Sequence, residues 1–121
     1  MLTRERSPPT VMILENEAII AEDMASSFRD AGFKIAGVFY TCMGSEAWLK
    51  SETPEIAILD IMLNDGHCVG VVKILKKRNV PILIYSATIV DCDKMSVFKD
   101  LPRIEKPAPT DDLVEAARKL L

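Results

Sequence analysis

The stretch IAILD, residues 56–60, holds four consecutive apolar residues and ends at an aspartate. A short apolar run without polar alternation is typical of a strand that is buried on both faces of a parallel sheet. Two similar runs, VMIL at residues 11–14 and VPILIY at residues 80–85, also stop at polar residues. The three runs therefore predict the centre of a parallel sheet whose strands end in polar side chains.

The segments between these runs favour helices and edge strands. Ile20, Met24, Phe28 and Ala31 recur at helical spacing, and Gly32 follows as a helix-ending residue. We expect further helices over 41–51, from Cys68 through Leu75, at about 91–99, and after Thr110 as the N-cap. The segments 33–40 and 101–105 are predicted as the remaining strands.

Strands that alternate with helices through short loops indicate an α/β fold. We predict a doubly wound, five-stranded parallel sheet of the flavodoxin-like (βα)5 type, with strand order 2-1-3-4-5 and five helices. This domain is expected to cover residues 11–121, after a flexible leader at residues 1–10. In such sheets, ligands bind outside the carboxyl ends of the strands.

Composition excludes several classes of protein. The chain has 121 residues, with Lys+Arg 15 against Asp+Glu 18 and a net charge of -3, which suits one globular domain rather than a nucleic-acid binder. No apolar run approaches the roughly 18 residues that a membrane span needs. The start, MLTRERSPPT, lacks the apolar region of a secretory signal. We expect a cytoplasmic protein with no nucleic-acid or membrane partner.

The cysteines are odd in number and widely spaced, at Cys42, Cys68 and Cys92. This pattern favours reduced thiols over a disulfide framework. With His67 as the single histidine, a zinc cluster would lack ligands.

Polar residues follow the predicted strands in a regular order. The motifs are ILEN at 13–16, ILDIML at 58–63, IYSAT at 84–88 and IEKP at 104–107. In this order and spacing they resemble the receiver domain of two-component response regulators. The segments LDIMLNDG and PILIYSAT are most similar to stand-alone receivers that carry no output domain.

The resemblance implies a role for each strand-end residue. Asp60 would accept a phosphoryl group from a histidine kinase or phosphotransfer protein, since a carboxylate can attack phosphorus to form an acyl phosphate. Ser86 would donate a hydrogen bond to a phosphoryl oxygen, and Lys106 would neutralise another. The peptide bond between Lys106 and Pro107 is expected to be cis.

A cation is needed for such chemistry, because a carboxylate does not easily approach a phosphate dianion. Mg²⁺ prefers oxygen ligands. The expected ligands are Glu15, Asn16, Asp60 and the backbone carbonyl of Met62.

Two positions depart from the family's pattern. Asn16 stands where receivers usually carry the second acidic residue that binds Mg²⁺, so the site loses one negative charge. Arg103 stands where the family usually has a Tyr or Phe that swings inward on phosphorylation. A guanidinium cannot be buried there without a partner, which alters the expected switch formed by Ser86 and Arg103.

Each of these residues also has a purely structural interpretation. Asp60 could be a polar strand terminus and Lys106 a solvated lysine. Glu15 could be an acid favoured at a helix start, with Asn16 as the N-cap, and Ser86 could cap a turn.

The leading hypothesis is a signalling receiver that acts through contact with an unknown downstream protein and is not an enzyme beyond its own acyl-phosphate chemistry. A homodimer remains open. The alternative is a pseudo-receiver that binds partners without phosphorylation, supported by Asn16 and Arg103. A nucleotide or flavin site is disfavoured by the acidic turn at residues 15–17, and a hydrolase by the lack of a nucleophile elbow.

Overall fold

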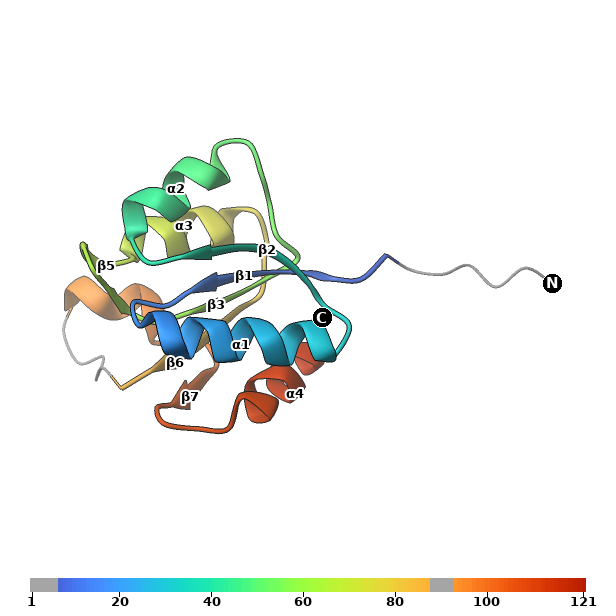
Figure 1. Cartoon of the computed structure of the whole chain (residues 1–121). Helices are drawn as coiled ribbons and strands as arrows, with labels where there is room; N and C mark the ends of the chain where they lie inside the picture. The colour runs from blue at the N-terminus through green and yellow to red at the C-terminus, as the bar shows by residue number, and fades with distance from the viewer. Residues whose placement is uncertain (1–6, 88–92) are drawn as a thin grey trace.

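The computed structural model describes residues 7–87 and 93–121, and Figure 1 shows a sheet with helices on both faces. Its elements are, in chain order, β1 (Thr10–Leu14), α1 (Ala18–Asp30), β2 (Lys34–Phe39), α2 (Cys42–Leu49), β3 (Ile56–Leu59), β4 (Met62–Leu63), β5 (Gly66–His67), α3 (Val69–Lys77), β6 (Ile82–Ser86), the 3-10 helix η1 (Asp93–Phe98), β7 (Arg103–Glu105) and α4 (Thr110–Leu120).

The main sheet has five strands in the order β2-β1-β3-β6-β7, and every neighbouring pair is parallel. Counted along the chain, this is the predicted order 2-1-3-4-5, so the predicted fold class is confirmed. The apolar runs lie at the centre because β1, β3 and β6 are covered on both faces. Every residue of 11–14 and 56–59 is buried.

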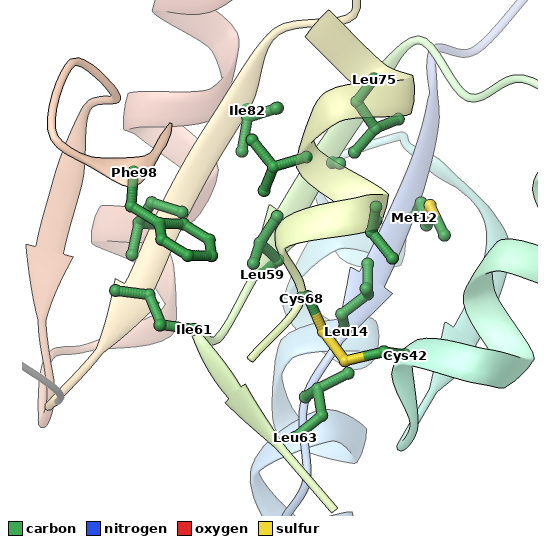
Figure 2. Packing of buried hydrophobic residues seen from close by; sticks show 14 of the residues in the cluster. Met12, Leu14, Cys42, Leu59, Ile61, Leu63, Cys68, Leu75, Ile82 and Phe98 are labelled. Carbon is green, nitrogen blue, oxygen red and sulfur yellow. A yellow bond between two sulfur atoms is a disulfide. The ribbon is translucent and has the colours of Figure 1, made fainter. Parts of the chain in front are cut away.

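Alternation along the strands divides the core into two layers. In β1, Val11 and Ile13 pack with α1 and α4 on one face, while Met12 and Leu14 pack with α2, α3 and η1 on the other. Figure 2 shows part of the second layer, which includes Leu75 of α3 and Ile82 of β6. Burying one such aliphatic side chain stabilises the fold by about 1.5–3 kcal/mol.

Several local predictions are wrong or incomplete. The described part of the predicted helix at 91–99 is a 3-10 helix, so the described residues contain four α-helices rather than five. Residues 62–67 form a small antiparallel hairpin of β4 and β5 that the turn signal at 64–66 only partly indicated. Residues 1–6 of the predicted leader, and residues 91–92, lie outside the described part of the chain.

Two predicted helix caps are also wrong. Thr110 is the first residue of α4 rather than its cap, which is Pro109, and its hydroxyl instead shares a hydrogen bond with Ser27 of α1. The cap of α1 is Glu17 rather than Asn16. Gly32 follows α1 with φ of 93°, as expected for a residue that ends a helix in the left-handed region.

The expectation of reduced thiols is wrong for two of the three cysteines. Cys42 and Cys68 form a disulfide with their Cα atoms 5.4 Å apart. They meet because α2 and α3 pack closely. Gly70 of α3 lies so near Glu46 of α2 that a side chain on residue 70 would begin 3.0 Å from the Glu46 carboxylate. Cys92 lies outside the described residues.

No helix in the described ranges has the length and hydropathy needed to cross a bilayer.

Candidate phosphoacceptor site

Four polar side chains from four strand ends meet at the carboxyl edge of the sheet. Glu15 follows β1, Asp60 follows β3, Ser86 ends β6 and Lys106 follows β7. Parallel strands end at a common edge, so residues 45 and 46 positions apart become neighbours. The structure therefore brings together four of the site residues that the sequence selected.

Asp60 is bonded through both oxygens of its carboxylate. Ser86 Oγ donates to Oδ1 at 2.6 Å, and the backbone N–H of Met62 donates to the same atom at 3.2 Å. Lys106 Nζ donates to Oδ2 at 2.7 Å. The side chain is 9% exposed, so the carboxylate is held near the surface in a fixed orientation.

Lys106 joins two carboxylates. Its Nζ lies 2.7 Å from Asp60 Oδ2 and 2.7 Å from Glu15 Oε1. Burial by itself lowers the pKa of Lys106, but the close contacts of its ammonium group with the negatively charged carboxylates of Asp60 and Glu15 outweigh burial and raise the pKa above its usual value. The lysine is therefore held as an ammonium ion between the acids.

Glu15 has a buried carboxylate, and one of its two oxygens lacks a hydrogen bond within the described residues. Its Oε2 accepts from the backbone N–H of Glu17 at 3.0 Å. Its Oε1 forms the ion pair with Lys106 but has no hydrogen bond of good geometry within the described residues. A buried carboxylate oxygen whose contact within the described residues is a single ammonium group keeps lone pairs that can bind a hard cation.

The residues present fit a magnesium site of reduced charge. The carboxylates of Glu15 and Asp60 lie around one ammonium group, and Asn16, which is half-buried, follows Glu15 in the chain. Within residues 7–87 and 93–121, no group of three or more His, Cys, Asp and Glu side chains is arranged as a metal site. Oxygen ligands would thus come from two carboxylates, with the Met62 carbonyl and the Asn16 amide to complete the set.

Sequence reasoning missed Asp65, which fixes the hairpin that follows Asp60. Its carboxylate accepts from the backbone N–H groups of Cys42 at 2.6 Å and Met43 at 2.9 Å, at the start of α2. The N–H groups of Met43 and Cys42 lower the pKa of Asp65 below its usual value. The sequence shows Asp65 only as an aspartate in a turn. The Met43 N–H group that it binds, at the start of α2, is 22 positions away in sequence.

Tyr85 was also missed, and it supports the segment that carries Lys106. Its buried hydroxyl donates to the carbonyl of Ala108 at 3.1 Å and accepts from the N–H of Ala108 at 3.0 Å. Lys106 Nζ lies 5.5 Å from the centre of the Tyr85 ring. The peptide bond between Lys106 and Pro107 is cis, as predicted.

Arg103 lies on the exposed side of the edge strand β7 and is not buried in an aromatic slot. Its Nη2 donates to the backbone carbonyl of Ser86 at 3.2 Å. The N–H of Lys106 donates to the same carbonyl at 3.2 Å. Arg103 therefore contacts the backbone of the residue whose hydroxyl binds Asp60.

No protein-family model matches the chain. One curated relative is the alkaline phosphatase synthesis transcriptional regulatory protein SphR of Synechococcus elongatus, 27% identical over 92% of this chain. The chain spans about half of that relative, 48% of its length.

Solved structures with the same fold include a response regulator receiver protein from Sinorhizobium medicae, with a TM-score of 0.80, 24% identity, and 93% of this chain and 94% of that chain covered. Another is SdrG from Sphingomonas melonis, with a TM-score of 0.79, 24% identity, and 96% and 98% covered. At these identities, the likeness to the solved structures shows a shared fold.

Proposed function

Because the chain has the receiver fold of response regulators, we propose that it accepts a phosphoryl group on Asp60 from a histidine kinase or phosphotransfer protein. The observation that carries the proposal is the joint binding of the Asp60 carboxylate by Ser86 and Lys106 beside Glu15. A polar strand terminus would need none of these partners.

The reaction requires Asp60 to attack as a nucleophile. A carboxylate oxygen forms a bond to phosphorus while the bond from phosphorus to the donor's imidazole nitrogen, or to the acetate oxygen of acetyl phosphate, breaks. The electron pair of that bond leaves with the donor. Ser86 and Lys106 now donate to the carboxylate oxygens, and they are placed to donate to the oxygens of the incoming phosphoryl group.

Charge explains the need for cations in this pocket. Glu15 and Asp60 contribute two negative charges and Lys106 one positive charge, so an incoming phosphoryl group meets a net negative site. Mg²⁺, when bound by Glu15, Asp60, Asn16 and the Met62 carbonyl, would supply the missing positive charge. The chain's own residues position the nucleophile and hold its oxygens.

The output would pass to an unknown downstream protein through the edge formed by β6 and β7. Phosphorylation withdraws the Ser86 hydroxyl from Asp60, and Arg103 is bonded to the carbonyl of the same residue. A shift of Ser86 therefore changes the position of an exposed guanidinium rather than that of a buried aromatic ring.

A second candidate is a pseudo-receiver that binds partners without phosphorylation. It is favoured by the neutral side chain at Asn16 and by the hydrogen bonds that both Asp60 oxygens already accept within the protein, from Ser86 and Met62 at Oδ1 and from Lys106 at Oδ2. In this case Lys106 would serve as a permanent internal cation.

The test is incubation of the protein with acetyl phosphate and Mg²⁺, followed by intact mass measurement. The wild type should gain one phosphoryl group, Asp60→Asn should gain none, and Asp111→Asn, on α4, should behave as the wild type. A wild-type protein that stays unmodified over hours, or an Asp60→Asn protein that is modified equally, would leave the pseudo-receiver as the better function.

A further inference from the structure

The disulfide of Cys42 and Cys68 joins the starts of two helices on one face of the sheet. Cys42 is the first residue of α2, and Cys68 is the N-cap of α3. Figure 2 shows the sulfur bridge between the two helices, beside Leu14 and Leu63 of the same core layer. The bridge closes a loop that contains the β4 and β5 hairpin.

Cys68 lies where a helix favours negative charge, at the start of α3, whereas the first N–H groups of α2, beside Cys42, already bind the Asp65 carboxylate. The first N–H groups of a helix have no partner within it, and the helix dipole adds partial positive charge at this end. A thiolate is favoured at such a position. The side chain of Cys68 makes no capping hydrogen bond. The start of α3 therefore offsets part of the cost of a thiolate at this fully buried residue, which makes Cys68 a suitable leaving group.

The fold accommodates the reduced form as well. The carbonyl oxygen of Gly66 lies 3.4 Å from Cys42 Sγ, which is within hydrogen-bond reach of a thiol. Reduction of the disulfide would thus leave the Cys42 thiol with an acceptor in place.

A surface hollow of about 460 Å³ gives access to one of the two sulfur-bearing residues. Cys42 lines it together with Ala47, Lys50 and His67, whereas Cys68 does not. Lys50, Glu46 and Asp65 also line the hollow, so charges of both signs are present and the hollow does not select an entering molecule by one sign of charge.

We propose that Cys42 and Cys68 form a thiol–disulfide exchange site, at which a small thiol compound enters this hollow and reacts with Cys42. The sulfur of the compound, as a thiolate, attacks Cys42 Sγ. The bond between the two protein sulfurs breaks, and its electron pair leaves on Cys68 Sγ, which takes a proton from water. A second thiolate attacks the compound's sulfur in the mixed disulfide, which releases Cys42 as a thiolate and the compound as its own disulfide. Two thiols are oxidised and one protein disulfide is reduced.

The test uses the full chain with Cys92→Ser, so that the pair holds the remaining sulfhydryl groups. The oxidised protein is treated with 2-mercaptoethanol, quenched with acid and alkylated under denaturing conditions, and alkyl groups are counted by intact mass. We expect no alkylation before treatment, two alkyl groups after it, and a transient 2-mercaptoethanol adduct on Cys42. Two free thiols that persist after exposure to bis(2-hydroxyethyl) disulfide would overturn the proposal.

Access through the hollow is tested by filling it. Ala47→Trp, at an exposed position of α2, should slow reduction about tenfold, because approach to the sulfur limits exchange. Ser26→Trp, at an exposed position of α1 on the opposite face, is the matched control and should react at the rate of the parent protein. Equal rates for both variants would contradict entry through the hollow.

Single cysteines provide a measurement that does not depend on the filled hollow. In the Cys92→Ser background, Cys68→Ser leaves Cys42, which is 8% exposed and lines the hollow, and Cys42→Ser leaves Cys68, which is fully buried. The Cys68→Ser protein should form a mixed disulfide with bis(2-hydroxyethyl) disulfide about tenfold faster than the Cys42→Ser protein. A faster reaction at Cys68 would show that the assigned direction of attack is wrong.

Discussion

The Nζ atom of Lys106 lies 2.7 Å from Oδ2 of Asp60, although the residues are 46 positions apart in the chain. The same ammonium lies 2.7 Å from Glu15 Oε1. Lys106 thus separates two carboxylates that would otherwise face each other in a buried pocket, and both the stability and the chemistry of the site depend on it.

Lys106→Gln should lower the free energy of unfolding by about 2 kcal/mol at pH 7, because it leaves two carboxylates without their cation. This loss is smaller than that from a fully buried ion pair, because water reaches part of the Lys106 side chain. Urea unfolding measures the change. Lys119→Gln is the control, since its contact with Glu115 is exposed and 4.0 Å long, and it should change stability by less than about 0.5 kcal/mol. An equal effect of the two substitutions would show that the buried ion pair does not stabilise the fold.

The stabilisation from Lys106 should disappear in strong alkali. The pKa of Lys106 in the folded protein is raised above its usual value of 10.5. The charged ammonium therefore stabilises the folded state relative to the unfolded state at every pH at which the side chain is protonated in both. The advantage of wild type over Lys106→Gln is therefore complete below pH 10.5 and falls as the pH rises through the folded pKa. Unfolding of both proteins between pH 8 and pH 12 tests the sign. An advantage that grows above pH 10.5 would contradict it.

Asp65→Asn should lower the melting temperature at neutral pH, because the start of α2 loses a charged acceptor. The pKa of Asp65 is lowered in the folded protein, so its stabilisation is present above the usual value of 3.8 and is lost as the pH falls through the folded pKa. The difference between wild type and variant should thus shrink on acidification. Asp23→Asn, at an exposed position of α1, is the control and should leave the melting temperature nearly unchanged. A difference that widens in acid would be inconsistent with this cap.

The centre of the fold could be predicted from the sequence because burial on both faces demands continuous apolar runs. IAIL at 56–59 matches β3 at both ends, and the ends of parallel strands fix where Asp60 and Lys106 meet. The solved structures agree with the fold that these runs predicted.

The features that sequence reasoning missed depend on contacts between distant segments. Cys42 and Cys68 are 26 residues apart, and their pairing depends on how closely α2 approaches α3 at Gly70. Asp65 likewise reaches the start of α2 because it lies in the hairpin of β4 and β5. These strands have two residues each, which is too short for a periodic pattern in the sequence. Such contacts are set by tertiary packing, which no local pattern encodes.

Asn16 is the residue on which the proposed binding of Mg²⁺ depends most. It is half-buried, lies directly after Glu15, and makes no hydrogen bond through its side chain within the described residues. Asn16→Asp would add a third carboxylate to the pocket. Carboxylates about 5 Å apart repel by roughly 3 kcal/mol at an effective dielectric constant of about 20, so the variant should be less stable than wild type without metal.

Added Mg²⁺ should reverse this loss. Binding to the folded state stabilises it by RT ln(1 + [Mg²⁺]/Kd), and a third carboxylate lowers Kd, so the melting temperature of Asn16→Asp should rise more with Mg²⁺ than that of wild type. The variant should also be phosphorylated faster at sub-saturating Mg²⁺. Asn79→Asp adds the same charge at the opposite end of the sheet, at a residue with φ of 59° that aspartate tolerates, and should respond to Mg²⁺ as wild type does. If Mg²⁺ shifts all three proteins equally, Asn16 does not face the metal, and the proposed ligand set is wrong at this position.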